Sequence, residues 1–282
     1  MNTDMHADRL AEQERFAFGA NWQSFLETLD DQRIENAEAS LRRLLELDDL
    51  AGRSFLDIGS GSGLFSLAAR RLGATVHSFD YDPQAVACAE ALKQRCLPGD
   101  PAWTIEQGSA LDREYLGRLG QFDVVYCWGV LHHTGNLAEA LALASDLVRP
   151  NGLLCIAVYN DQGGASRRWH AVKRLYNRLP KPLRPLLVLG VATLFELKFA
   201  LVRLAQGRNP LPFADWRQKK KDRGMSAWHD WVDWCGGLPF EVARPEQIIV
   251  PQRKRGCVLQ NLTTCGGGWG CNQYVFKKAA DR

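Results

Sequence analysis

The chain has 282 residues, of which 46% are hydrophobic and 24% charged, and its formal net charge is +3. These values are ordinary for a soluble globular protein, and the length suffices for one large α/β domain with additions or for two small domains. The eight cysteines form no C-x-x-C pair, which argues against a zinc site or a thioredoxin-like motif and suits a reducing cytoplasm.

Residues 1–50 are predicted to be helical and to form a cap that precedes the sheet. They begin without the basic-then-apolar pattern of a signal peptide. Apolar side chains then recur at roughly helical spacing, at Phe16, Phe18, Trp22, Phe25, Leu26, Leu29, Ile34, Leu41, Leu44, Leu45 and Leu47. The cap either serves packing alone or also covers a bound ligand.

Residues 51–160 alternate short apolar runs with helical patterns, which predicts a parallel, doubly wound sheet. The predicted helices span Leu64–Leu72 and Leu137–Val148, and a further helix begins at Pro83, a residue suited to a first helical turn. A turn is predicted at 150–152. The predicted strands are Ser54–Ile58, Thr75–Phe79, Trp103–Gln107, Phe122–Cys127 and Leu153–Val158.

The first predicted strand ends in a glycine turn that reads D-x-G-x-G-x-G from Asp57 to Gly63. Glycines at alternate positions let the backbone approach a ligand where a Cβ would clash. The turn leads into a helix N-terminus, where free N–H groups favour a carboxylate or a phosphate. The dinucleotide fingerprint requires a small residue at position 64, and Leu64 stands there. The pattern therefore predicts a site for a small anionic ligand other than the usual dinucleotides.

The second predicted strand ends at Asp80, about 20 residues after the glycines, where doubly wound folds place a carboxylate that binds ribose. Glycine turn, strand and acid in this order resemble the first motifs of the class I S-adenosylmethionine (SAM) methyltransferases. The segment 122–133 is similar to that family's fourth strand and the loop after it.

The resemblance implies SAM as the cofactor and assigns roles to individual residues. Asp57 and the glycine turn, with Gly59, Ser60, Gly61 and Gly63, would hold the methionine portion, and Asp80 would hold the ribose hydroxyls. Tyr81 either packs on adenine or lies at the surface. The family usually has an acid after the third strand, where this chain has Ser109 and Ala110, while Asp112 is an alternative helix cap. Trp128 begins the loop that borders both cofactor and acceptor.

His132 and His133 follow in that loop, close to the expected reacting centre. Either imidazole could act as a general base at neutral pH. The alternative is that the histidine pair only orients the loop and packs.

Residues 161–239 are predicted to form a basic helical insert between the fifth and sixth strands. Within it, 161–225 holds 15 Lys and Arg against 4 Asp and Glu, a net charge of +11, which leaves −8 for the remainder. An apolar stretch runs from Leu186 to Leu204, but Glu196, Lys198 and Arg203 interrupt it and make it too polar for a membrane span. It is either a helical lid or dimer surface, or a helix in the interface of an anionic membrane.

The insert ends in a segment that concentrates three tryptophans, a histidine and two acids, at 225–237. On a helix, His229 and Asp233 share a face, and Asp230 is adjacent in sequence. His229 with Asp230 is a second candidate for a general base in an acceptor pocket. The alternatives are a Trp-rich packing element and an incomplete metal site; we predict no metal.

Residues 240–282 complete the sheet. Pro245–Arg255 is predicted to be a helix, and strands are predicted at Cys257–Thr263 and Cys271–Lys277. The predicted fold class is α/β, a doubly wound, seven-stranded, mostly parallel sheet with an antiparallel C-terminal strand, the N-terminal helical cap and the helical insert.

The sequence therefore predicts a cytoplasmic SAM-dependent methyltransferase that acts on a small-molecule or glycan- or lipid-linked acceptor, most readily by O-methylation. The segment at 225–241 and the glycine loop at 265–271 are similar to bacterial members that serve polysaccharide and other specialised biosynthesis. Two alternatives stay open: an RNA methyltransferase that uses the basic insert, and a SAM-binding regulatory module without turnover. Peripheral contact with an anionic membrane and a dimer through the insert are further options.

Overall fold

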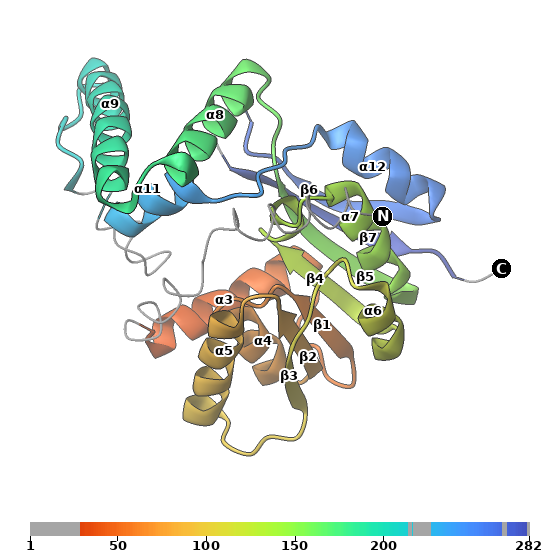
Figure 1. Cartoon of the computed structure of the whole chain (residues 1–282). Coiled ribbons are helices and arrows are strands. Elements are labelled where there is room, and N and C mark those ends of the chain that lie inside the picture. The colour runs from red at the N-terminus through yellow and green to blue at the C-terminus, as the bar shows by residue number, and fades with distance from the viewer. Residues whose placement is uncertain (1–28, 214–215, 217–226, 267–269, 281–282) are drawn as a thin grey trace. The chain divides into compact units, whose positions relative to one another are not determined.

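The computed structural model describes residues 29–213, 216, 227–266 and 270–280 (Figure 1). They form two compact units. The sheet unit comprises the described residues up to 162 together with those from 239 onward, and the helical unit comprises those of 163–238. The predicted helices before residue 29 lie outside the described residues.

The sheet unit contains a seven-stranded sheet in the order β3-β2-β1-β4-β5-β7-β6. Strands β1 to β5 pair in parallel, and β7 is antiparallel to both β5 and β6, which confirms the predicted fold class. The strands are β1 (Ser54–Ile58), β2 (Thr75–Asp80), β3 (Trp103–Gln107), β4 (Phe122–Trp128), β5 (Val148–Tyr159), β6 (Cys257–Thr263) and β7 (Cys271–Lys278).

Helices cover both faces of the sheet because alternate side chains of each strand point to opposite sides. Phe55 packs with the residues of α3 (Asp31–Leu45), α4 (Leu64–Arg71) and α5 (Pro83–Cys96). Its neighbour Leu56 packs on the opposite face. That face is covered by α6 (Arg113–Leu119), α7 (Leu137–Asp146) and α12 (Pro245–Lys254).

The boundary between α7 and β5 corrects one prediction. The helix was expected to reach Val148, but it ends at Asp146, and Val148 already pairs with Phe122 of β4. The N–H of Phe122 donates to the Leu147 carbonyl at 2.8 Å, so this stretch belongs to the sheet. The expected turn is absorbed into the strand as an irregularity, where Asn151 has a φ of 63°.

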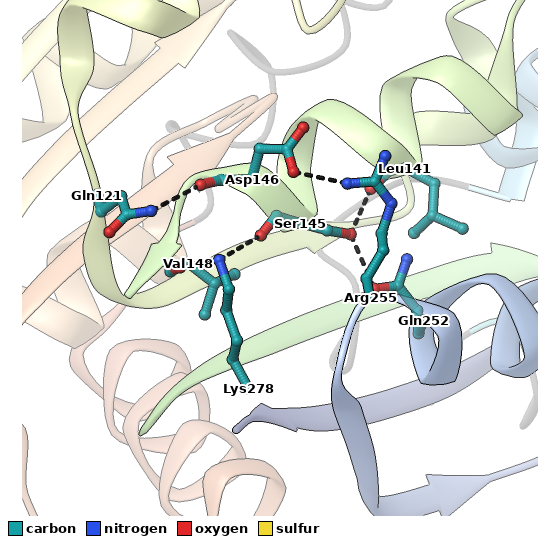
Figure 2. Close-up of polar contacts among 8 residues, drawn as sticks. All are labelled: Gln121, Leu141, Ser145, Asp146, Val148, Gln252, Arg255 and Lys278. Carbon is teal, nitrogen blue, oxygen red and sulfur yellow. Dashed lines mark hydrogen bonds and ion pairs between the residues drawn. The ribbon is translucent and has the colours of Figure 1, made fainter. Parts of the chain in front are cut away.

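A hydrogen-bond network fastens the C-terminal elements to the junction of α7 and β5 (Figure 2). The Ser145 hydroxyl lies 2.8 Å from the Gln252 amide oxygen and 2.6 Å from the Leu141 carbonyl. Lys278 of β7 donates to the Val148 carbonyl at 2.7 Å. Ser145 and Gln252 are buried, whereas the Arg255–Asp146 ion pair beside them is exposed to solvent.

The described part of the helical unit contains α8 (Gly164–Arg178), the short η2 (Lys181–Leu183), α9 (Arg184–Ala205) and α11 (Ala227–Gly236). Both α8 and α9 contact α11 (Figure 1). Their core is aromatic: Phe195 stacks on Trp169 with ring centroids 5.3 Å apart and on Trp231 at 5.9 Å.

Lys173 is buried in this unit and donates to the Trp234 carbonyl at 2.7 Å, near the C-terminus of α11. Burial lowers the pKa of Lys173 to about 8. A cation at this place balances the negative end of the helix dipole.

The network at α7 yields a test of stability. Changing Ser145 to Ala removes the partner of the buried Gln252 amide, and we expect the free energy of unfolding to fall by roughly 1–3 kcal/mol. Arg255→Gln breaks only the exposed ion pair of the same network and should cost less than about 1 kcal/mol. Urea denaturation of the full chain measures both. Equal effects of the two substitutions would contradict the assigned role of burial.

Candidate functional site

The carboxyl ends of the parallel strands meet where the strand order reverses, between β1 and β4. In open α/β sheets this reversal opens the crevice that binds ligands. The glycine turn follows β1 and is tied to β2, because the N–H groups of Gly59 and Ser60 donate to the Phe79 carbonyl at 2.8 and 3.1 Å. The turn therefore lies at the crevice with its backbone held in place.

Two glycines of the turn have no substitute. Gly59 has a φ of 73°, and a Cβ built there would lie 2.4 Å from a methyl group of Val130, in the loop after β4. Gly63 has a φ of 78°, and its Cβ would lie 2.9 Å from Ala89 of α5. Positive φ strains any residue with a side chain, and the close contacts add to that strain.

The turn leaves polar groups available for a ligand. The Ser60 hydroxyl is buried and has no hydrogen-bond partner among the described residues. Helix α4 begins after Gly63, and no side chain caps its N-terminus. A buried hydroxyl without a partner is costly unless a ligand or water bonds to it.

Asp80 closes the turn from the end of β2. Its carboxylate accepts hydrogen bonds from the N–H of Gly61 at 2.9 Å and from the N–H of Asp82 at 3.0 Å. Burial raises the pKa of Asp80, while these hydrogen bonds act in the opposite direction. Each carboxylate oxygen keeps a lone pair that could accept from a ligand hydroxyl.

Asp57 lies behind the turn and is only 3% exposed. The Ser66 hydroxyl of α4 donates to its carboxylate at 2.5 Å. Burial raises the pKa of Asp57 to about 7; the Ser66 hydrogen bond opposes the rise and the charge of Asp80 adds to it. Burial thus disfavours the charged form of both carboxyl groups, and the hydrogen bonds that they accept offset part of this effect.

The remaining residues predicted to border the cofactor differ from one another in exposure and contacts. Tyr81 is exposed beside Asp80, and Trp128 is exposed at the end of β4. The Ser109 hydroxyl accepts from the N–H of Leu111 at 3.2 Å, and Ala110 packs against the core. Asp112 caps α6 by accepting from the N–H of Tyr115, which confirms the alternative considered for it.

His132 and His133 form a short 3-10 turn (η1, Leu131–His133) after β4. His132 is fully buried, and its ring packs on Tyr159 with centroids 3.9 Å apart. His133 is partly exposed, and its Nδ1 lies 2.6 Å from the Pro239 carbonyl. Because a carbonyl only accepts, Nδ1 carries the proton, and Nε2 is the basic nitrogen of the neutral ring.

Sequence reasoning missed the segment that holds this loop. The N–H of Glu241 donates to the His132 carbonyl at 3.0 Å, and the Glu241 carboxylate accepts from the N–H of Leu137 at the start of α7. Tyr159, at the end of β5, stacks between the histidines and Phe240. The only signal for Tyr159 in the sequence was its position at the end of a strand.

The role of His229 and Asp230 as a second general base stays a prediction. Both belong to α11 of the helical unit, and their side chains are outside the described part of the structure. Among the described residues, no group of three or more His, Cys, Asp or Glu side chains could hold a metal ion.

Comparisons with known proteins agree with this geometry. A family profile described as a methyltransferase domain matches residues 29–186, more than half of the chain. The ubiquinone biosynthesis O-methyltransferase of Thiobacillus denitrificans is 30% identical over 118 residues, which are 39% of this chain and 46% of that protein. The corresponding Xanthomonas euvesicatoria protein is 28% identical over 178 residues, 57% of this chain and 67% of that one. The matched regions thus span about half to two thirds of these curated relatives.

Solved structures share the fold at low identity. The magnesium protoporphyrin IX methyltransferase of Synechocystis PCC 6803 with bound SAH has a TM-score of 0.52 and 14% identity, and the match covers 87% of this chain and 83% of that one. An O-methyltransferase family protein from Burkholderia thailandensis also has a TM-score of 0.52, with 15% identity and coverage of 89% and 59%.

The buried carboxyl groups make the stability of the ligand-free protein depend on pH. The folded state raises the pKa of Asp57 from 3.8 to about 7, so it binds this proton more tightly than the unfolded state. The free energy of unfolding should therefore fall as the pH rises from 4 to 7, by roughly 2–4 kcal/mol for this group. In Asp57→Asn the part of this fall in unfolding free energy that Asp57 causes should be absent. Urea denaturation across the pH range measures it.

Asp123 provides a control of opposite sign. Burial alone would raise its pKa, but hydrogen bonds from Ser54 and the charge of Arg149 lower it below the ordinary value. Asp123→Asn should therefore destabilise the protein at neutral pH and much less at pH 3. An unfolding free energy of Asp57→Asn that tracks the unsubstituted protein at every pH would refute the role of Asp57.

Proposed function

This chain belongs to the methyltransferase-domain family of SAM-dependent enzymes, and from that premise we propose that it transfers the methyl group to an oxygen of a small acceptor in the cytoplasm. The observation that carries the proposal is the glycine turn at the reversal of strand order. The turn is hydrogen-bonded to Asp80, and its buried Ser60 hydroxyl has no hydrogen-bond partner among the described residues.

The residues of the crevice fit SAM group by group. The Ser60 hydroxyl and the uncapped N-terminus of α4 suit the carboxylate of the methionine portion. Asp80 suits the ribose hydroxyls, since both of its oxygens keep acceptor capacity. Asp57, buried behind the turn and bonded to Ser66, would act on the methionine portion by holding the turn in place. Tyr81, exposed beside Asp80, offers an aromatic face for adenine.

SAM, when bound, supplies a methyl group that its sulfonium has already activated. The chain must then align the acceptor and take up the proton that the acceptor oxygen loses. We assign the proton to Nε2 of His133, because its Nδ1 is engaged by the Pro239 carbonyl. His132 is buried against Tyr159 and serves to position the loop.

The class of acceptor is inferred from the relatives and from the site. Relatives at 28–30% identity are named as ubiquinone biosynthesis O-methyltransferases, which supports a small hydroxyl-bearing acceptor. A general base is needed for a hydroxyl, which must lose a proton, and the orientation of His133 provides one. Glycan-linked and lipid-linked acceptors carry the same hydroxyl chemistry and fall within the proposal.

Asp80 tests the cofactor site. Asp80→Asn removes the charge and one acceptor, and we expect the affinity for SAM to fall at least about tenfold, the loss of one or two hydrogen bonds to a charged group. Asp82→Ala is the matched control: Asp82 lies two residues away, and its side chain caps α5 by accepting from the N–H of Gln84. Isothermal titration with SAM should show the control near the unsubstituted value. Equal affinities of Asp80→Asn and the unsubstituted chain would sink the assignment.

His133 tests the chemistry. In His133→Asn the side-chain amide can still donate to the Pro239 carbonyl but offers no base, so kcat should fall by about 10²- to 10⁴-fold with unchanged SAM affinity. The substitution leaves Leu131 and His132 unchanged. If His133 is the base, the fall of kcat/KM at low pH, which protonation of the base causes, should also disappear in this variant.

The assay follows labelled methyl from SAM into a panel of phenols, carboxylic acids and sugars. Retention of full kcat in His133→Asn would contradict the proposed base. Labelling of tRNA instead of any panel member would move the function to RNA. Release of SAH with a labelled product excludes a regulatory module without turnover.

A further inference from the structure

Helix α9 presents a continuous apolar face to solvent. Six leucines on it are 57–69% exposed: Leu186, Leu189, Leu194, Leu197, Leu201 and Leu204. At 100° per residue they fall within an arc of about 140°, and no charged residue shares this arc. The helix of 22 residues is about 33 Å long, so the leucines form one stripe along its whole length.

The sides of α9 outside this arc are already used by the helical unit. Phe195 stacks between Trp169 and Trp231. Glu196 pairs with Arg203 at 3.5 Å and accepts from the indole N–H of Trp216 at 2.9 Å. The packing of the unit therefore consumes one face of the helix and leaves the leucine stripe uncovered. Single exposed leucines are normal on protein surfaces, but a contiguous stripe of six marks an interaction site.

Several positively charged residues of the helical unit are exposed to solvent. Arg174 and Arg178 of α8, Lys181 of η2, and Lys198 and Arg208 of the α9 segment all have exposed side chains. Lys198 lies at the border of the leucine arc, where its aliphatic stem can lie on apolar surface while the ammonium stays in water. The segment 161–225 as a whole carries a net charge of +11.

We propose that the leucine stripe of α9 docks the protein in the interface of an anionic lipid bilayer. An apolar face with basic flanks is the composition of helices that lie in the membrane plane. Each exposed Lys or Arg adds attraction to anionic headgroups. A second copy of the chain is disfavoured as the occupant, since it would bring two strongly positive segments together, and nucleic acid has no use for a leucine stripe.

The alternative membrane arrangement is a span. Lys181–Ala205 is, within the described residues, the one helix long and apolar enough to cross a bilayer, judged by length and composition. Crossing would strip Phe195 from Trp169 and Trp231 and carry the Glu196–Arg203 pair into hydrocarbon. Docking in the plane keeps both, because it uses only the exposed face.

Flotation of the full chain with vesicles tests the proposal. We expect binding to phosphatidylcholine vesicles that contain about 30% phosphatidylglycerol, weak binding to pure phosphatidylcholine, and release by salt. Leu194→Gln with Leu201→Gln should weaken binding at least about tenfold, since two deeply inserted side chains are lost. Glutamine is a good helix former, so the helix persists.

Matched controls separate surface loss from misfolding. Val258→Gln with Leu262→Gln removes two exposed apolar side chains from β6 of the sheet unit and should leave flotation unchanged. Arg174→Gln with Arg178→Gln should lower binding to anionic vesicles and reduce its salt dependence. SAM affinity, measured on every variant, should stay constant, so failure of docking is distinguishable from failure of the methyltransferase site.

Four results would overturn the proposal. The first is no flotation with the anionic vesicles. The second is salt-resistant binding to neutral vesicles as well, which indicates a span. The third is a dimer in analytical ultracentrifugation that the leucine variant dissociates while lipid binding is absent, which gives the stripe to a second copy. Binding of tRNA without vesicle binding would likewise assign the basic segment to nucleic acid.

Discussion

The hydrogen bond from the Gly61 N–H to the Asp80 carboxylate is the contact on which the candidate site depends. It joins the turn after β1 to the end of β2, and the bonds from Gly59 and Ser60 to the Phe79 carbonyl join the same two elements from the other side. Together they hold three consecutive N–H groups against β2, so that the open side of the turn faces the crevice. Without this lock, a loop of glycines would be the most mobile part of the sheet edge, since glycine restricts the backbone least.

The burial of two carboxyl groups beside this turn disfavours their charged forms in the absence of a ligand. Burial is the main cause that raises the pKa of both Asp57 and Asp80, and the negative charge of Asp80 repels that of Asp57. A site that holds two such carboxyl groups gains by accepting a ligand with positive charge and hydroxyl donors, since the ligand replaces the missing solvation. SAM carries a sulfonium, an ammonium and ribose hydroxyls. The burial of these carboxyl groups thus lowers the stability of the ligand-free protein and also favours a cationic ligand. Binding sites commonly lose stability in this way for the sake of function.

Local patterns in the sequence were enough for the sheet and the glycine turn, because short-range chemistry governs both. The D-x-G-x-G-x-G spacing requires positive φ at its glycines, and strand alternation identifies the buried runs. The boundary at Val148 was missed because its pairing with Phe122 is a tertiary contact that overrides the helical pattern before it. The partner of His133, Pro239, lies 106 residues away, and no spacing rule announces such a contact. Burial and this pairing distinguish the two adjacent histidines, which the sequence presents as equivalent.

The exposed leucines of α9 show a further limit of pattern reading. The sequence marks the stretch 186–204 as apolar, and the charges at 196, 198 and 203 argued against a membrane span, while a helix in the membrane interface stayed open. In the structure Glu196 and Arg203 pair with each other outside the leucine arc, with most of both side chains buried, so the arc itself carries no charge. Hydropathy averaged over all sides of a helix hides this separation. The helical unit folds around Trp169, Phe195 and Trp231 and does not need the leucine stripe for its core. Because an uncovered stripe of this size favours aggregation in water, its presence is best explained by a surface that it contacts. The net positive charge of the segment 161–225 makes an anionic bilayer the surface that fits it best.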